Sequence, residues 1–401
     1  MTGAGLAALV LAAGKSTRMG RDKPLLALGE GTVVERVIDL FQTAGITDIR
    51  VVVGHHGERL IPVVQKAGAR AVFNSGYEGG MFTSVLAGLK TLDFRCAGVF
   101  MLPVDVPLVR PSTLRRLMDA WRRIPGKGGP EMDAGRAILH PTFQGRRGHP
   151  PLIGGGHIAD ILKWRGDGGL RTYTAEWERC AVEIPVADRF ILVDMDTPED
   201  YRRIADGQFC YDLPSPAECA ALMVEVLAVP PSVWGHCRAV ADAAVILGHA
   251  LNQAEGRRRT GSPLSLPLIR AAALVHDLAR EQPDHARAGA AFLRSMGFDA
   301  VADIVAVHME LPPEREGRLE EAEVVFLADK LADGDVRVTL EERFRRQAAR
   351  FGGESAAAAG IARRLSSAQA VRDEVERCVG RPLASILAER THDLSASARG
   401  D

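Results

Sequence analysis

The sequence predicts an α/β unit with a mostly parallel sheet, followed by an all-α unit. In roughly the first 205 residues, short apolar runs alternate with stretches of helical spacing, a pattern typical of parallel sheets with helices on both faces. The segment GQFCYDLPSPAE (207–218) interrupts this pattern. From there to about residue 385, alanine, leucine and valine recur at helical spacing without a convincing strand.

Apolar runs and capping residues mark the individual elements. Strands are expected at residues 6–11, 49–53, 71–73, 98–102 and 190–193, and a helix at residues 32–44. The glycine- and proline-rich region 124–135 is expected to be a loop. In the second unit, Ser215 is a good N-cap because Pro216 can open the helix after it.

These patterns set the expected domain limits. We place the first domain at residues 1–207, a linker at 208–216, the all-α domain at 217–392 with its core at about 230–345, and a flexible tail at 393–401. Because a domain typically has about 100–200 residues, the length of 401 alone allows two or three domains.

Composition and charge exclude several classes of protein. The chain is 46% hydrophobic and 25% charged, with 50 basic against 51 acidic residues, as expected for a soluble globular protein. A formal net charge of −1 argues against a nucleic-acid or membrane partner. No apolar run reaches the roughly 18 residues of a membrane span.

The amino end and the cysteines favour a cytoplasmic protein. The stretch MTGAGLAALVLAAGKSTRMG lacks the basic region of a signal peptide, and we expect a first buried strand there. The six cysteines form no CxxC pair and no regular spacing, which indicates free thiols in a reducing compartment.

A glycine-containing loop follows the first expected strand. In LAAGKSTRMGRDK (11–23), backbone N–H groups could approach a polyphosphate, and Lys15, Arg18 and Lys23 add positive charge. The spacing matches neither GxxxxGK[ST] nor GxGxxG. The segment therefore predicts an anion-binding loop, and a plain glycine turn with solvated charges is the alternative.

Two aspartates follow expected strands. Asp105 comes after GVFMLPV and Asp196 after ILVDM, and ligands of parallel sheets bind at the carboxyl ends of the strands. Two carboxylates there could hold Mg²⁺ against a triphosphate. The alternative for Asp196 is a role in a helix start, where Thr197 caps a helix begun by Pro198. Asp194 is a weaker candidate for the metal site, because side chains alternate along a strand and that of Asp194 would lie on the opposite face.

The first half of the sequence resembles the molybdenum-cofactor nucleotidyltransferase family, whose members have a Rossmann-like α/β fold. The resemblance rests on LAAGKSTRMGRDKPLL, GYEGGMFTSVLAGL, VDVPLV, GRRGHP and DMDTPEDY, in this order. The alanine in LAAG resembles the cytidylyltransferase branch. This implies a reaction of CTP with molybdopterin cofactor that gives the cytosine dinucleotide and pyrophosphate, and it suggests a molybdoenzyme as the recipient.

The resemblance also implies roles for single residues. The nucleotide would contact Leu11, Ala12, Ala13, Gly14, Lys15 and Lys23, and Arg18 would contact its phosphates. Asp105 would bind Mg²⁺ with Asp196 as the second ligand, and Gly148 and His149 would lie near the pterin. Lys23 and Arg18 would neutralise the departing pyrophosphate. Phe82 departs from the family, which usually has a small residue there, so the base and acceptor contacts stay open.

Polar residues interrupt the apolar faces of four expected helices in the second half. They are His236, the pair His276–Asp277, His308 and Asp329. A lone histidine in such a place is more often a hydrogen-bonded core residue. A buried carboxylate is rarer because its desolvation is costly, and four helices that direct such groups toward one core indicate a metal.

The segments HDLAR (276–280), HARAGAAFL (285–293) and FLADKLADGDVR (326–337) resemble HD-domain metal phosphohydrolases, especially a branch that hydrolyses dinucleoside polyphosphates. The resemblance implies a first metal on His236, His276, Asp277 and Asp329, and a second on His285 and His308 with Asp277 as the bridge. Transition metals such as Fe or Mn are expected. Arg280 stands where that branch often has lysine, and it could contact a phosphate.

Three functions therefore compete. The first is a bifunctional cytidylyltransferase and metal phosphohydrolase. The second keeps the transferase but gives it a sugar or alcohol phosphate as acceptor. The third makes the HD half a regulatory or docking module. A further His392–Asp393 dipeptide has no ligand residues after it, and we interpret it as chance.

Overall fold

The computed structural model describes residues 5–93, 95–124, 134–207, 210–254, 262–315, 317–351 and 355–388. It divides the chain into two compact units, Met1–Phe209 and Cys210–Asp401, each described by itself below. Most of the loop expected at 124–135, the tail expected at 393–401 and the His392–Asp393 dipeptide lie outside the described residues.

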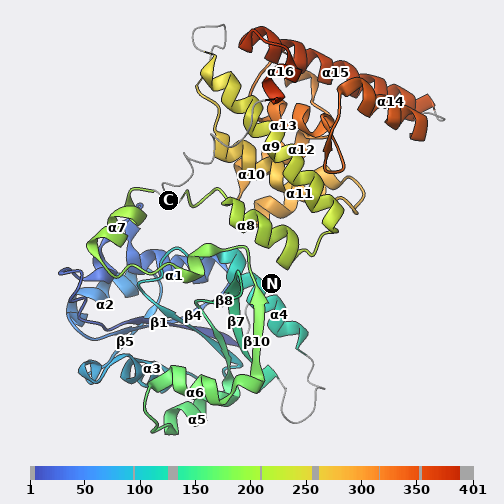
Figure 1. The fold of residues 1–401 in the computed structure, drawn as a ribbon. Helices are drawn as coiled ribbons and strands as arrows, with labels where there is room; N and C mark the ends of the chain where they lie inside the picture. The colour runs from blue at the N-terminus through green and yellow to red at the C-terminus, as the bar shows by residue number, and fades with distance from the viewer. Residues whose placement is uncertain are drawn as a thin grey trace. The chain divides into compact units, whose positions relative to one another are not determined.

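An eight-stranded sheet forms the centre of the first unit (Figure 1). Its strands are β1 (Leu6–Ala12), β4 (Asp48–Val53), β5 (Arg70–Phe73), β6 (Gly98–Pro103), β7 (Ile138–Phe143), β8 (Arg146–Arg147), β9 (Leu152–Gly154) and β10 (Ala181–Pro185). Their order is β10-β7-β9-β6-β1-β4-β5, with β8 paired to β7. Strands β1, β4, β5 and β6 pair in parallel, as do β7 and β10, whereas β8 and β9 are antiparallel to their neighbours. The predicted fold class is confirmed.

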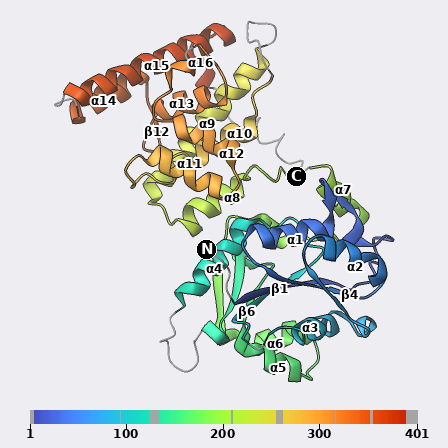
Figure 2. The ribbon, with the colours of Figure 1, turned by 180° about the vertical axis from the view of Figure 1, so that it is seen from behind.

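Helices cover both faces of this sheet (Figures 1 and 2). One face carries α1 (Val33–Thr43), α2 (Gly57–Lys66) and α4 (Pro111–Arg123), and the other carries α3 (Met81–Leu89), α5 (Ile158–Lys163) and α6 (Gly169–Glu176). Helix α1 starts where predicted. The Thr32 hydroxyl accepts a hydrogen bond from the Glu35 backbone N–H, and the Glu35 carboxylate accepts one from the Thr32 N–H. A small hairpin of β2 (Ala27–Leu28) and β3 (Gly31–Thr32) precedes it.

The parallel pairing of β1, β4 and β6 brings their carboxyl ends to one edge. Ala12 lies opposite Val53, and Leu11 lies opposite Pro103. A Cβ atom on Gly54 would lie 2.7 Å from the Cβ of Tyr77 and 2.9 Å from that of Ala13. The close approach of three segments thus requires glycine there.

The prediction of a strand at residues 190–193 is wrong. Arg189–Leu192 form a 3-10 helix, because the Asp188 carboxylate accepts a hydrogen bond from the backbone N–H of Phe190 and turns the chain. Phe190 and Ile191 are nevertheless buried, so the apolar run reflects burial and not strand formation. Short apolar runs have this ambiguity.

Asp188 also holds the start of α4, and we expect Asp188→Ala to destabilise the first domain by about 3–5 kcal/mol. The carboxylate is 1% exposed and accepts hydrogen bonds from the Thr113 hydroxyl and the Arg110 backbone N–H, at 2.7 and 2.9 Å. It also pairs with the Arg110 guanidinium at 3.3 Å, so its removal leaves a buried cation without this carboxylate. Urea unfolding measures the change.

The matched control is Asp119→Ala. Asp119 forms an exposed i,i+3 pair with Arg122 on α4, and its loss should cost less than about 1 kcal/mol. Equal stabilities of the Asp188→Ala and Asp119→Ala variants would contradict the expectation.

In the residues that the structure describes, the second unit contains helices and one short hairpin. Its helices are α8 (Pro216–Ala220), a π-helical turn (Ala221–Val226), α9 (Pro231–Gln253), α10 (Leu266–Val275), α11 (His285–Ser295), α12 (Asp299–Val307), α13 (Glu321–Lys330), α14 (Leu340–Phe351), α15 (Ser355–Val379) and α16 (Leu383–Leu387). Helix α9 packs on α10 and α13, and α11 lies beside α12 (Figure 2). The capping role predicted for Ser215 is confirmed, because its hydroxyl accepts a hydrogen bond from the Glu218 backbone N–H.

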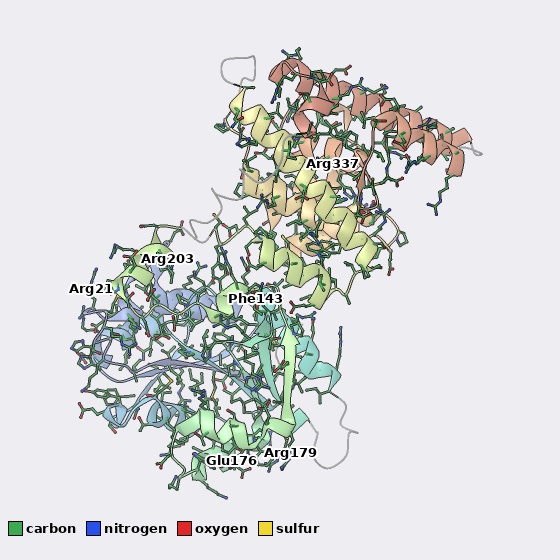
Figure 3. All side chains as sticks on the ribbon, in the orientation of Figure 1. Arg21, Phe143, Glu176, Arg179, Arg203 and Arg337 are labelled. Atoms are coloured by element: carbon green, nitrogen blue, oxygen red, sulfur yellow. The ribbon has the colours of Figure 1, made fainter. Side chains whose placement is uncertain are left out.

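The hairpin of β11 (Ala332–Asp333) and β12 (Val336–Arg337) was not predicted. Strands of two residues are too short for a recognisable alternation of apolar and polar residues. Arg337, labelled in Figure 3, donates a hydrogen bond to the Leu387 carbonyl and so joins the hairpin to α16. Among the described residues, no helix has both the length and the apolar character that crossing a bilayer requires.

Candidate active sites

A cavity of about 350 Å³ opens at the carboxyl edge of the first sheet. The loop after β1 forms one side, the amino end of α3 another, and the end of β6 the third. All six residues predicted to contact a nucleotide line it, namely Leu11, Ala12, Ala13, Gly14, Lys15 and Lys23. Asp105 lines it too. This follows from the sheet order, because β1 lies between β4 and β6.

The structure brings Lys23 and the two predicted carboxylates together. The Lys23 ammonium lies 2.7 Å from Asp196 Oδ1 and 3.4 Å from Asp105 Oδ2. Arg18 donates a hydrogen bond to the other oxygen of Asp196 at 2.9 Å. The hydrogen bond from Lys23 holds the pKa of Asp196 below its ordinary value. One cation thus already bridges the two carboxylates, which shows that their oxygens converge on a common point.

Asp196 reaches this point from a segment without strand structure. The Met195 backbone N–H donates to the Asp105 carbonyl at 2.7 Å, which ties this segment to the loop after β6. The helix start considered as the alternative is also present. Thr197 caps α7 (Pro198–Ala205) through a hydrogen bond from the Asp200 N–H, and the Asp200 carboxylate accepts from the Asp196 N–H. The two interpretations of Asp196 are therefore compatible.

Lys15 lines the cavity, but its ammonium points to another partner. It pairs with Glu78 at 2.7 Å, and both side chains are largely exposed. The hydrogen bond to Glu78 raises the pKa of Lys15. Lys15 is therefore separate from the group of Lys23, Asp105 and Asp196.

Gly148 and His149 lie on a loop that packs against the 3-10 helix. A Cβ on Gly148 would lie 2.4 Å from the Ile191 carbonyl oxygen, and the His149 N–H donates to that oxygen at 2.9 Å. Burial lowers the pKa of the His149 imidazole, while the charges of Asp105 and Asp194 oppose this shift. The charges of both Asp105 and Asp194, the aspartate ranked lower in the sequence, thus act on the His149 imidazole, but His149 does not line the cavity.

Several cavity residues were not singled out in the sequence. Tyr77, Gly80, Met81 and Ser84 line the cavity, and the segment GYEGGMFTSVLAGL was the signal that could have found them. Phe82 does not line it and packs instead on the buried cluster on the α3 side of the sheet.

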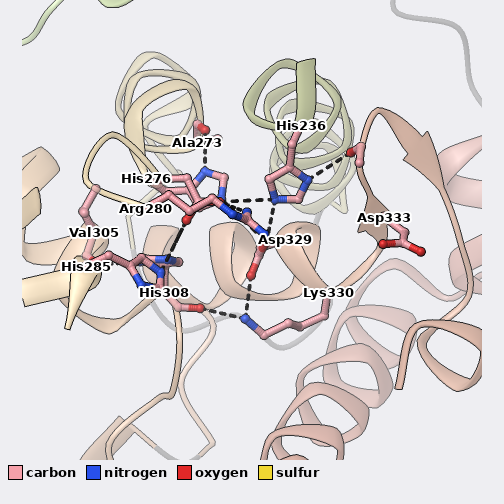
Figure 4. A network of polar contacts seen from close by, with 12 residues as sticks. His236, Ala273, His276, Arg280, His285, Val305, His308, Asp329, Lys330 and Asp333 are labelled. Carbon is pink, nitrogen blue, oxygen red and sulfur yellow. Dashed lines mark hydrogen bonds and ion pairs between the residues drawn. The ribbon is translucent and has the colours of Figure 1, made fainter. Parts of the chain in front are cut away.

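In the second unit, the side chains predicted from four helices converge on one buried point (Figure 4). His236 lies on α9, His276 and Asp277 follow α10, His308 follows α12, and Asp329 lies on α13. Each is at most 6% exposed. His285, the first residue of α11, lies at the rim with 22% of its side chain exposed.

The two oxygens of Asp277 face different histidines. Oδ2 lies 3.8 Å from His236 Nε2 and 3.7 Å from His276 Nε2, and Oδ1 lies 3.4 Å from His285 Nε2 and 3.6 Å from His308 Nε2. Asp329 Oδ1 belongs to the first group, at 3.0 Å from His236 Nε2 and 3.6 Å from His276 Nε2. The arrangement matches two neighbouring sets of donors that share Asp277.

Backbone carbonyls fix how the imidazoles are turned. The Nδ1 atoms of His236, His276 and His308 lie 3.0, 2.8 and 2.7 Å from the carbonyl oxygens of Gly334, Ala273 and Val305. A carbonyl only accepts, so each Nδ1 donates and each Nε2 faces the cluster, where a neutral imidazole would offer a lone pair to a metal. The Nε2 atoms of His276 and His308 are buried without a hydrogen-bond partner. Buried orphan nitrogens beside carboxylates fit a divalent metal.

Cations compensate the two buried carboxylates. Burial opposes ionisation of Asp329, but the Lys330 ammonium, 2.6 Å from its Oδ2, contributes to holding its pKa well below the ordinary value. For Asp277, burial is likewise outweighed by His276, His308 and Arg280, and its pKa is lowered. Arg280, expected at a phosphate, pairs here with Asp277. Lys330 was not among the predicted site residues, because no sequence pattern distinguishes a buried lysine beside an acidic residue from an exposed one.

Comparisons with known proteins give a family match in each of the two units. Residues 8–180 match the MobA-like NTP transferase domain family, and residues 233–334 match the HD domain family. Nicotine blue oxidoreductase of Paenarthrobacter nicotinovorans is 27% identical over 49% of this chain and 94% of its own length. Molybdenum cofactor cytidylyltransferase of Escherichia coli K12 is 26% identical over 48% of this chain and 92% of its own.

Among solved structures, a nucleotidyl transferase from Methanothermobacter is 25% identical to this chain. The match covers 51% of this chain and 98% of the other chain, with a TM-score of 0.42. Each family match falls within one of the two compact units. The protein therefore carries a MobA-like NTP transferase domain followed by an HD domain.

Proposed function

We propose that the first domain is a cytidylyltransferase that uses CTP and molybdopterin cofactor and releases pyrophosphate. The observation that carries the proposal is the convergence of Lys23, Asp105 and Asp196 beside the loop of residues 11–16. The likeness to the molybdenum cofactor cytidylyltransferase of Escherichia coli, over 92% of its length, supports the choice of nucleotide and acceptor.

The residues of the pocket suit a direct displacement. A terminal phosphate oxygen of the acceptor attacks the α-phosphorus of CTP, and the bond to the departing pyrophosphate breaks, so no protein nucleophile is needed. Lys23 and Arg18 bind the charge that develops on the pyrophosphate. Asp105 and Asp196 would hold Mg²⁺, which when bound supplies further charge neutralisation. The ammonium that already bridges the two carboxylates supports this assignment.

Another acceptor is the second candidate. The bifunctional IPC transferase and DIPP synthase of Rubrobacter xylanophilus is 36% identical over 28% of this chain and 27% of its own length. The bifunctional protein GlmU of Geobacter metallireducens is 35% identical over a similar share. This candidate keeps the transferase and gives it a sugar or alcohol phosphate as acceptor. Because another relative is named an oxidoreductase, nucleotide consumption must be measured directly.

Nucleotide consumption by the full-length protein separates these candidates. The protein is incubated with CTP or GTP and with molybdopterin cofactor, a sugar phosphate or no acceptor. We expect CTP to disappear only with molybdopterin cofactor, and one pyrophosphate to form for each CTP. Consumption of CTP with the sugar phosphate alone would favour the second candidate. A redox change without nucleotide consumption would contradict both.

For the HD domain we propose a metal-dependent phosphohydrolase. His236, His276, Asp277 and Asp329 would hold one divalent metal such as Fe or Mn, and His285 and His308 a second, with Asp277 between them. When bound, such metals polarise a phosphate and activate water for its hydrolysis. The regulatory or docking alternative does not account for the two buried imidazole nitrogens of His276 and His308, which are costly without a hydrogen-bond partner unless a ligand uses them.

A further inference from the structure

Three side chains with metal-binding donor atoms lie together in the first domain, apart from the pair of Asp105 and Asp196. They are Asp22, His55 and His56. One donor atom of each lies within 4.8 Å of those of the other two. Asp22 belongs to the loop after β1 and the histidines to the turn after β4, so the cluster joins two loops that are 34 residues apart in the chain.

The turn after β4 places the two imidazoles side by side. Successive side chains of an extended chain point in opposite directions. Here His56 has a φ of 51°, in the left-handed region, and the turn brings both rings to the same side. The ring centroids of His55 and His56 are 3.8 Å apart, with 30° between the ring planes. Two neighbouring residues can therefore both serve as ligands of one ion.

The Asp22 carboxylate completes the cluster. Its Oδ1 lies 2.9 Å from His56 Nδ1, and its Oδ2 lies 2.9 Å from Arg59 Nη1. The Arg59 side chain is 63% exposed, and an exposed ion pair contributes little stability, so it is no obstacle to an ion at Oδ1. A carboxylate that binds a metal through one oxygen is commonly held through hydrogen bonds from outside the site, which is the role that Arg59 can take.

The donor set selects the kind of ion. Two imidazoles and one carboxylate suit a divalent transition metal such as Zn²⁺, whereas Mg²⁺ prefers oxygen ligands alone. Asp105 and Asp196 offer only oxygens, so the two sites differ in the metal that they favour. The side chains of Asp22 and His56 are 21% and 46% exposed, which gives an ion access from solvent.

The cluster is connected to the walls of the cavity in the first domain. The His55 backbone N–H donates to the Ala13 carbonyl at 3.4 Å, and the His55 ring lies 6.0 Å from the ring of Tyr77, centroid to centroid. Ala13 and Tyr77 line the cavity, as does Lys23, which follows Asp22 directly. An ion bound by all three ligands would therefore fix the loop of residues 13–23 against the turn after β4.

We propose that Asp22, His55 and His56 bind one divalent transition-metal ion such as Zn²⁺, and that this ion favours the form of the cavity that binds CTP. The ion is a structural one, separate from the Mg²⁺ expected at Asp105 and Asp196. The effect on CTP rests on the proposed cytidylyltransferase, whereas the metal site does not.

Zinc binding by the full-length protein tests the site. The protein is stripped of metal with a chelator and dialysed against buffered Zn²⁺ with excess Mg²⁺, which competes for sites made of oxygens alone. We expect the His55→Gln/His56→Asn variant to bind one zinc ion fewer than the parent, as counted by plasma mass spectrometry. The HD cluster is intact in both proteins and contributes equally. Asparagine tolerates the left-handed backbone of residue 56, so the fold should be kept. Equal zinc counts would overturn the proposal.

Two single variants separate the carboxylate from its ion pair. Asp22→Asn and Arg59→Gln both break the Asp22–Arg59 pair, but only Asp22→Asn removes a ligand. We expect Asp22→Asn to weaken zinc binding at this site at least tenfold, and Arg59→Gln to keep the parent count. Parent-like binding by Asp22→Asn, or an equal loss in both variants, would contradict the role of Asp22 as a ligand.

Chemical modification of histidines locates the ion. Zn²⁺ should protect His55 and His56 from diethyl pyrocarbonate in the parent but not in Asp22→Asn, as measured by mass spectrometry of the peptide that contains both. His249 is the internal control, because it is partly exposed and contacts Gln253 away from either cluster. It should react equally with and without Zn²⁺. Equal reactivity of His55 and His56 with and without Zn²⁺ would place the zinc elsewhere and overturn the site.

The affinity for CTP tests the link to the cavity. With Mg²⁺ present, Zn²⁺ should tighten CTP binding by the parent about tenfold, a usual size for coupling between two ligands, and change that of His55→Gln/His56→Asn by less than about twofold. The same response in both proteins would refute the link. If the parent binds no CTP under either condition, the proposed cytidylyltransferase fails, and the zinc count still decides the metal site.

Discussion

The Asp105→Ala substitution is expected to lower CTP-dependent pyrophosphate release by about 100–1,000-fold. Asp105 and Asp196 share the Lys23 ammonium, and loss of one carboxylate removes half of the predicted cation site. Groups that stabilise charge in the transition state typically contribute a factor of about 100–1,000 each. Pyrophosphate release is measured with a coupled assay, with molybdopterin cofactor as acceptor.

The matched control is Asp119→Ala, because Asp119 lies on α4 and contacts Arg122 at the surface. It should retain the parent rate. Asp105 is partly exposed, with 27% of its side chain accessible, so the variant should fold normally and keep its melting temperature within a few degrees. Full activity of a folded Asp105→Ala protein would refute the assignment of this pocket.

The second large effect is expected in the HD domain. His276→Ala should abolish phosphohydrolase activity and release the bound metal, because His276 Nε2 is buried, has no hydrogen-bond partner and faces both carboxylates. Removing a ligand from such a site lowers both the affinity for the metal and the activity. Metal content is measured by plasma mass spectrometry on the full-length protein, and activity is measured after separate addition of Fe²⁺, Mn²⁺ and Mg²⁺.

The control here is His249→Ala. His249 lies on α9 like His236, but its Nε2 contacts Gln253 instead of the cluster. This variant should keep both metal and activity, and chelation of the parent should reproduce the His276→Ala result. A parent protein that folds fully, binds no metal and shows no hydrolysis would instead favour a regulatory or docking module.

The two effects should be independent. Asp105 and His276 lie in different compact units, and the distances that define each site involve residues of one unit only. Asp105→Ala should therefore keep the hydrolase activity, and His276→Ala the transferase activity.

Much of both sites could be predicted from the sequence because the signals are local. The loop of residues 11–16 follows a strand that an apolar run marks, and parallel pairing of β1 and β6 then puts Asp105 beside it. In the second half, His236 and Asp329 each interrupt a helical apolar stripe, and such a position faces the core whatever the neighbouring helices are. Periodicity reports burial of a face, and polar residues on a buried face need a partner.

The errors arose where burial had more than one structural solution. Residues 190–193 are apolar and buried, but the Asp188 carboxylate accepts the hydrogen bond of Phe190 N–H and makes a 3-10 helix instead of a strand. Asp196 then reaches Lys23 from an irregular segment, 173 residues away along the chain. No local sequence pattern shows which atoms the carboxylate of Asp188 or of Asp196 will contact.

The sequence by itself determined the two fold classes, the glycine-containing loop after the first strand and the histidines and aspartates that face the second core. Only the tertiary structure decided how these groups share partners. It gave Asp277 one oxygen for each pair of histidines, placed Lys330 against Asp329, and brought Asp22 to the two histidines that follow β4. The physical reason is that patterns along a helix or strand fix which face is buried, whereas distances between charges depend on the packing of segments far apart in the chain.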